Sequence, residues 1–307
     1  MKQKSLGKGL IFGFLAFSIW GTLPLYWKLL SKIDPLHILA LRIFLSLALV
    51  GIILLVSRNS AWLTVFKNPK KACFLTLTAI ILCGNWGLYI WAVNRGHTLD
   101  ASLGYFINPL VSIVLGLLFY RERLPPLQWA AIAIAAAGVI ILGIFSGALP
   151  WISLALAVSF GLYGLMKKKS PLSALESLGA ETLASVPIGF MLLLFSYSSA
   201  PARSLFPVFT GTQGLLYFGE LPVHVLVPLA FCGVVSALPL YLFAQSAKLL
   251  PLSTLGFAQF ISPTLQFFWG LFVFGESFPP HHFIAFALIW IAVILYVVSL
   301  RPKQSKQ

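Results

Sequence analysis

Two stretches of apolar sequence carry matching rows of polar side chains that could bind a solute. The rows are Tyr105, Asn108 and Ser112, and Gln259, Ser262 and Gln266. Each has the spacing i, i+3, i+7, which places its members on one face of a helix. Amides and hydroxyls are poorly accommodated by lipid, so both faces are predicted to point inward. They would either line a cavity or hold the helices together through interhelical hydrogen bonds.

A proline interrupts each row, Pro109 in the first and Pro263 in the second. Proline lacks a backbone amide and frees the carbonyl four residues earlier in a helix. Those carbonyls belong to Tyr105 and Gln259. A kinked helix with a free carbonyl can line a cavity or bend in a gate, so we predict that the two prolines mark kink or gating points.

Aromatic and amide side chains at mid-span positions are further candidates for contact with a substrate. They are Trp20, Asn85, Trp86, Tyr89, Tyr241 and Gln245. The pairs 85/89 and 241/245 have the spacing i, i+4, so the members of each pair share a helix face. An aromatic wall would suit an aromatic or cationic ligand. The alternative is that these rings only pack against neighbouring helices.

Two charged residues, Arg42 and Glu181, lie inside apolar segments. A charge at the bilayer centre costs about 2.5–3.5 kcal/mol on insertion scales. Arg42 could reach an interface and Glu181 could be protonated. Alternatively both face a cavity, where Arg42 attracts an anionic group, and Glu181 meets a cationic group or carries a proton. Their depths differ by roughly 10 Å or more along the membrane normal, which predicts no direct ion pair.

The elements that position these residues are predicted to be membrane-spanning helices. Of 307 residues, 59% are hydrophobic and 9% are charged, far below the charged fraction of soluble domains. A span needs about 20 apolar residues, which predicts an all-α integral membrane protein with ten transmembrane helices. The predicted segments are 10–30, 37–56, 72–93, 99–119, 127–145, 150–166, 175–196, 224–246, 253–274 and 283–300. Most of the basic residues lie at the termini or in short gaps between these segments, which excludes nucleic acid as a partner.

The distribution of positive charge predicts which way the chain crosses the membrane. With the N terminus in the cytoplasm, sixteen of the 21 Lys and Arg residues lie on the cytoplasmic side and four on the external side. Positive residues favour the cytoplasmic face. Both termini are therefore predicted to be cytoplasmic, in a multi-pass protein whose solvent is the lipid bilayer.

The chain contains an internal repeat. "YFINPLVSIVLGLLFYRERLPP" (105–126) and "QFISPTLQFFWGLFVFGESFPP" (259–280) share eight of 22 positions. Five spans per copy is an odd number, so the second copy would enter the membrane from the opposite side. This explains why Glu122 has arginine neighbours and Glu276 has none. We predict two inverted five-helix repeats, 9–146 and 147–300, an arrangement typical of secondary transporters.

Several strings, "NWGLYIWAVN" (85–94), "LGYFINPL" (103–110), "ERLPPLQWAAI" (122–132) and "GFAQFISPTLQF" (256–267), resemble the RarD proteins. These belong to the EamA-like branch of the drug/metabolite transporter superfamily. The resemblance implies a carrier of the bacterial inner membrane that exports or exchanges small metabolites by alternating access. It also implies that spans 1–4 and 6–9 surround a central cavity, with spans 5 and 10 at the periphery.

The sequence lacks the motifs of several other classes. It has no nucleotide-binding loop, HExxH, CxxC or nucleophile elbow, so we expect no catalysis, no cofactor and no metal. The predicted function is secondary transport of a small polar or amphipathic metabolite or drug, with a proton as a possible coupling ion, by a monomer or homodimer. The alternative is a polytopic membrane enzyme acting on lipid-linked substrates, which would need a cluster of acid, His or Cys residues at one interface.

Overall fold

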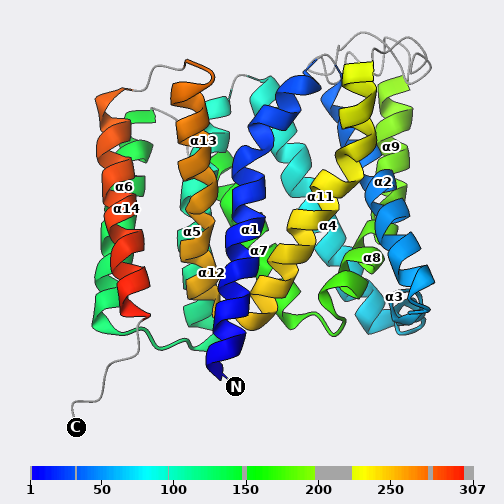
Figure 1. Cartoon of the computed structure of the whole chain (residues 1–307), viewed down its shortest axis with the longest axis horizontal. Coiled ribbons are helices and arrows are strands. Elements are labelled where there is room, and N and C mark those ends of the chain that lie inside the picture. The colour runs from blue at the N-terminus through cyan, green and yellow to red at the C-terminus, as the bar shows by residue number, and fades with distance from the viewer. Residues whose placement is uncertain are drawn as a thin grey trace.

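In a computed structural model, the chain forms a bundle of roughly parallel helices (Figure 1). The structure describes residues 2–31, 33–95, 97–146, 151–197, 223–275 and 279–300. The helices are α1 (Lys2–Leu29), α2 (Pro35–Val56), α3 (Ala61–Thr64), η1 (Val65–Lys67), α4 (Pro69–Asn94), α5 (Thr98–Tyr120), α6 (Pro126–Ser146), α7 (Trp151–Lys169), α8 (Ala174–Ala184), α9 (Val186–Tyr197), α11 (Val223–Leu249), α12 (Leu252–Gln259), α13 (Ile261–Phe272) and α14 (Pro280–Ser299).

Side-chain caps fix where several helices begin. The Asp34 carboxylate accepts from the amide of Leu36, 2.7 Å away, at the start of α2. The Asn68 side chain accepts from the amide of Lys71 at the start of α4. α8 opens with a reciprocal capping box between Ser173 and Glu176. Such contacts satisfy amides that have no partner within the helix, and they define sharp helix starts at the ends of the bundle.

The helices match the predicted segments, but the number of membrane spans is only partly established. Each predicted segment is helical, with bounds within three residues of the prediction except at the start of α1. Across the described residues, eight helical segments are long and apolar enough to cross a membrane, and α8 with α9 counts as one of them. The sixth predicted segment, α7, ends in three lysines, and the ninth is split into α12 and α13. Ten spans and inverted repeats therefore stay predictions, and Glu276 and the segment 198–222 lie outside the described residues.

The arrangement of the bundle separates a central group of helices from a peripheral pair. α6 and α14 lie side by side at the left edge in Figure 1. α5, which carries the first matching sequence, packs closely against α12, which leads into the second, where a Cβ on Gly256 would lie 2.7 Å from the carbonyl oxygen of Pro109. Only glycine allows this approach. α1 begins and α14 ends at the same end of the bundle.

Candidate functional site

A cavity of about 400 Å³ lies among the central helices. Its walls come from α1, α2, α4, α5 and α7, and from α12 and α13. The lining reaches the helix ends at Ser31, Ile33 and Ala101, so the cavity extends to the end of the bundle opposite the start of α1. Ten of the predicted contact residues line it, together with Pro263. The ten are Trp20, Arg42, Asn85, Trp86, Tyr89, Tyr105, Asn108, Gln259, Ser262 and Gln266.

Arg42 places a positive charge in the cavity wall. Its Cζ lies 4.2 Å from the ring centroid of Trp86 and 5.0 Å from that of Trp27. Its Nε donates to the hydroxyl of Ser236 on α11, 2.7 Å away. Among the residues that the structure describes, no carboxylate lies within 4.0 Å of the guanidinium. A charge in a largely apolar cavity wall without a counter-ion favours an anionic partner.

The two polar rows meet where α5 and α12 cross. The Gln259 amide donates to Ser112 Oγ at 2.9 Å, so Ser112 supports the wall from behind without lining the cavity. Ser262 donates to the backbone carbonyl of Phe17 on α1. The amide oxygens of Asn108 and Gln259 are buried and have no hydrogen-bond partner among the described residues. Buried acceptors of this kind are normally satisfied, so these two oxygens could accept hydrogen bonds from a bound molecule.

Aromatic rings form the rest of the wall. Tyr89 and Tyr105 meet at 5.6 Å between centroids, and Trp20 contacts Phe160 edge-on at 5.5 Å. Asn85 donates to Ser159 Oγ and to a backbone carbonyl of α7, so its amide nitrogen is occupied in holding α4 against α7. The cavity therefore combines large apolar surfaces with a few polar groups, as small-molecule sites usually do.

Besides Ser112, four predicted residues do not line the cavity: Pro109, Glu181, Tyr241 and Gln245. Tyr241 and Gln245 bond to each other at 2.9 Å on α11 and do not line the cavity. Pro109 lies inside the continuous helix α5, whereas Pro263 lies in the first turn of α13, just after the break at Phe260. Glu181 lies behind the wall, because its carboxylate is turned toward a lysine of α7.

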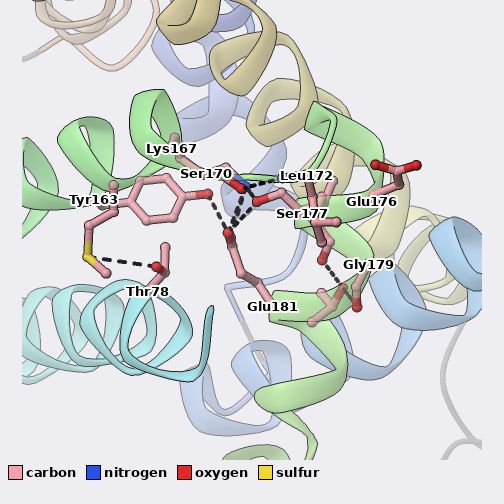
Figure 2. A network of polar contacts seen from close by, with 12 residues as sticks. Thr78, Tyr163, Lys167, Ser170, Leu172, Glu176, Ser177, Gly179 and Glu181 are labelled. Atoms are coloured by element: carbon pink, nitrogen blue, oxygen red, sulfur yellow. Dashed lines mark hydrogen bonds and ion pairs between the residues drawn. The ribbon is translucent and has the colours of Figure 1, made fainter. Parts of the chain in front are cut away.

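That lysine is Lys167, and the pair forms a buried charge network (Figure 2). Lys167 Nζ lies 3.0 Å and 2.9 Å from the two carboxylate oxygens of Glu181 and 3.0 Å from Ser177 Oγ. Ser177 donates to Glu181 at 2.7 Å, and the Tyr163 hydroxyl is 3.5 Å from it. Lys167 is 0% exposed and Glu181 is 2% exposed.

A second cavity of about 20 Å³ separates this network from the main cavity. It is lined by Arg42, Trp86 and Glu181, among others, and Arg42 and Trp86 also line the main cavity. The volume is enough for about one water molecule. These two side chains are therefore the partition between the main cavity and the buried carboxylate.

Charged side chains close the opposite end of the bundle by binding helix ends. Glu122, after α5, accepts from the amides of Leu252 and Ser253 at 2.7 Å and 3.0 Å, and from the Ser253 hydroxyl at 2.6 Å. It thus caps α12 from the other half of the chain. Lys168 of α7 donates to the carbonyls of Ala247, in the last turn of α11, and of Leu250, just after that helix. Each partner suits the partial charge of the helix end that it meets.

Lys248, at the end of α11, makes the equivalent contact with the end of α7. Lys248 donates to the carbonyls of Ser170 and Leu172, just after α7. The two helices therefore hold each other's carboxyl ends through exchanged lysines, and this end of the bundle is fastened by several charged contacts.

Sequence reasoning missed Trp27, Phe160, Ser236 and Lys167. Trp27 has the spacing i, i+7 from Trp20, which could have placed it on the same face. Lys167 belongs to a run of three lysines that the charge pattern predicts to be cytoplasmic, although a carboxylate within an apolar span calls for a partner. Nothing local in the sequence indicates that Ser236 faces Arg42.

Comparison with known proteins identifies the family. A model of the EamA-like transporter family matches residues 7–144. Protein RarD of Streptomyces exfoliatus is 43% identical over 94% of this chain and 87% of that protein. Protein RarD of Escherichia coli K12 is 36% identical over 97% of both chains. The chain belongs to the RarD family of EamA-like transporters. Another relative, the uncharacterized transporter YojE of Bacillus subtilis, is 42% identical over 97% of this chain and 96% of its own length.

A solved crystal structure supports the fold of this RarD-family chain. It covers 95% of this chain and 99% of its own, with a TM-score of 0.70 and 18% sequence identity. At that identity the likeness concerns the fold alone. With the apolar helices, the family membership makes the chain a multi-pass membrane protein of a bacterial transporter family.

Proposed function

We propose that the protein is a secondary transporter that moves a small polar or amphipathic organic molecule across the bacterial inner membrane by alternating access. The observation that carries this is the cavity of about 400 Å³ that extends to one end of the bundle while charged contacts fasten the other end. A carrier needs such a one-sided site near the midplane. The transporter names of its relatives favour this function over a membrane enzyme.

The transport cycle that we propose uses the two halves of the chain. With both termini in the cytoplasm and the halves inverted, the cavity would be open to the outside, and the end fastened by Glu122 would face the cytoplasm. Rocking of one half against the other would close the first end and open the second. The matched sequences on α5 and α12–α13, which pack against each other, support this arrangement.

The proposed solute combines an apolar body with an anionic or strongly polar group. Arg42 would hold the polar group, since it has no carboxylate partner within the described residues. The oxygens of Asn108 and Gln259 would accept hydrogen bonds from donor groups of the solute. Trp20, Tyr89 and the other aromatic rings of the lining would contact its apolar part. A proton remains a possible coupling ion for the cycle.

The test is a comparison of metabolites followed by transport in liposomes. Extracellular and intracellular metabolites of cells with and without the protein would be compared, and each compound whose distribution changes would be tested for uptake into proteoliposomes. The expected result is a saturable flux that Arg42→Ala abolishes, with Arg42→Lys retaining part of it because the charge survives. Protein-independent flux for every compound would contradict a transport function.

A further inference from the structure

The partition between the two cavities has a charge on each side. Arg42 lies at the main cavity with no carboxylate within 4.0 Å among the described residues. Glu181 lines the second cavity, which Arg42 also lines, so the two residues border the same small space of about 20 Å³.

In this structure Lys167 forms an ion pair with Glu181 and so balances its negative charge. Its ammonium group contacts both carboxylate oxygens and Ser177, and the network is shut off from solvent (Figure 2). Together Lys167 and Glu181 have no net charge, so Arg42 keeps its full attraction for an anion in the main cavity. Loss of either partner would leave a net charge on the far side of the partition, where the low dielectric strengthens its effect.

We propose that the Lys167–Glu181 pair acts through Arg42 as a remote charge switch that sets how tightly the main cavity binds an organic anion. With the pair closed, Arg42 is free to bind the anion. With the pair open, the carboxylate of Glu181 becomes the counter-ion of Arg42 across the second cavity and competes with the solute. This deepens the proposed function, since it requires the main cavity to bind solutes.

The position of the pair connects this switch to the transport cycle. Lys167 lies in the last turn of α7, close to the exchanged contacts of Lys168 and Lys248 that fasten the closed end. Opening that end would separate α7 from its neighbours and release Glu181 from Lys167. The binding of the anion to Arg42 would then weaken at the moment when the exit from the cavity opens. The switch therefore favours release at the end that is closed in this structure.

The experiment measures anion binding to the purified full-length protein by equilibrium dialysis. The probes are radiolabelled benzoate, phenylacetate and indole-3-acetate, three carboxylates with an aromatic body. Lys167→Met leaves a net negative charge behind the partition and should weaken binding about tenfold. Glu181→Gln leaves a net positive charge and should tighten it by a similar factor. A unit charge roughly 10 Å away at an effective dielectric constant of about 20 has an effect of this size.

The double variant separates the switch from a purely structural role. Lys167→Met combined with Glu181→Gln restores zero net charge and should bind within about threefold of the unmodified protein. A pair that only holds the fold together would give losses in both single variants and no recovery. Glu176→Gln is the matched control on the same helix, because Glu176 bonds Asn59 and does not line the second cavity; its binding should stay unchanged.

Each other outcome overturns the proposal. Single variants that shift affinity in the same direction, or not at all, would remove the electrostatic link. No binding of any of the three acids by the unmodified protein would remove the anion site itself. If Lys167→Met does not fold, the other two variants still test the proposal. Glu181→Gln should tighten binding, and the double variant should bind like the unmodified protein. A flux of uncharged solutes in liposomes would leave the transport function standing while this proposal fails.

Discussion

The carboxylate of Glu122 should act as a latch on the closed end of the bundle. It accepts two amides and one hydroxyl at the start of α12, and these contacts join the two halves of the chain. The carboxylate lies over Gly116, where a Cβ would approach Glu122 Oε2 to 2.8 Å. We predict that Glu122→Gln shifts the protein toward a form in which this end is open.

The contacts indicate how large the shift should be. A hydrogen bond to a charged group contributes about 1.5–3 kcal/mol, and a helix N-cap contributes about 0.5–2 kcal/mol. Glutamine keeps one acceptor oxygen but loses the charge and the second acceptor. We therefore expect closure to weaken by about 3 kcal/mol, which is roughly a hundredfold in the equilibrium between closed and open forms. Gly116→Ala should act in the same direction by pushing the carboxylate away.

The assay is a distance measurement by pulsed electron spin resonance in liposomes. Spin labels at Arg121 and Lys169, both exposed, report the separation across the closed end. The unmodified protein should give one main distance, and Glu122→Gln should add a longer one. Glu176→Gln, which removes a carboxylate from the capping box of α8, should leave the distribution unchanged.

Two results would refute this reasoning. An unchanged distance distribution in Glu122→Gln would show that the carboxylate does not hold the end closed. An equal change in Glu176→Gln would show that any weakened helix start at this end loosens the bundle. The contact of Glu122 with α12 would then not be what holds the end closed.

Three further predictions concern topology and the cavity wall. A reporter active only in the cytoplasm should work when fused after Glu122 and fail after Gly275; the same result at both sites would contradict the inverted halves. A cysteine at Gln266 should react with small polar thiol reagents in a background without native cysteines, whereas one at Ile289, which is 0% exposed, should not. Ser236→Ala should weaken binding of a carboxylate probe about threefold to tenfold, because the guanidinium loses the acceptor of its Nε, a bond of about 1 kcal/mol; unchanged dialysis binding would show that Ser236 does not orient it.

The sequence predicts the helices and much of the cavity wall because both depend on local pattern. Apolar length sets the segments, and the spacing i, i+3, i+7 places Asn108, Gln259 and Ser262 on inward faces. These three side chains do line the main cavity. Whether they bind a substrate is not decided by the pattern, and it stays a prediction.

The rest depends on contacts between distant parts of the chain. Lys167 and Glu181 are on different helices, and only the packing of α7 with its neighbours makes a lysine from a basic cluster fully buried. The prolines give a similar lesson. The local chemistry is the same at Pro109 and Pro263, yet α5 continues through the first while the helix is interrupted just before the second. Helix continuity is set there by surroundings that a single segment does not encode.

The indole of Trp86 has a consequence for the proton permeability of the membrane. It contacts the guanidinium and separates the main cavity from the second one, behind which lie the buried ion pair and the fastened end of the bundle. A small side chain at this position would join the two spaces and let water enter from the main cavity as far as Glu181. The fastened end of the bundle would then be the remaining barrier to a path along which protons could pass without solute. In this protein a single aromatic ring would keep water away from the buried ion pair, and cells making the Trp86→Ala protein should lose part of their proton gradient whenever the fastened end opens.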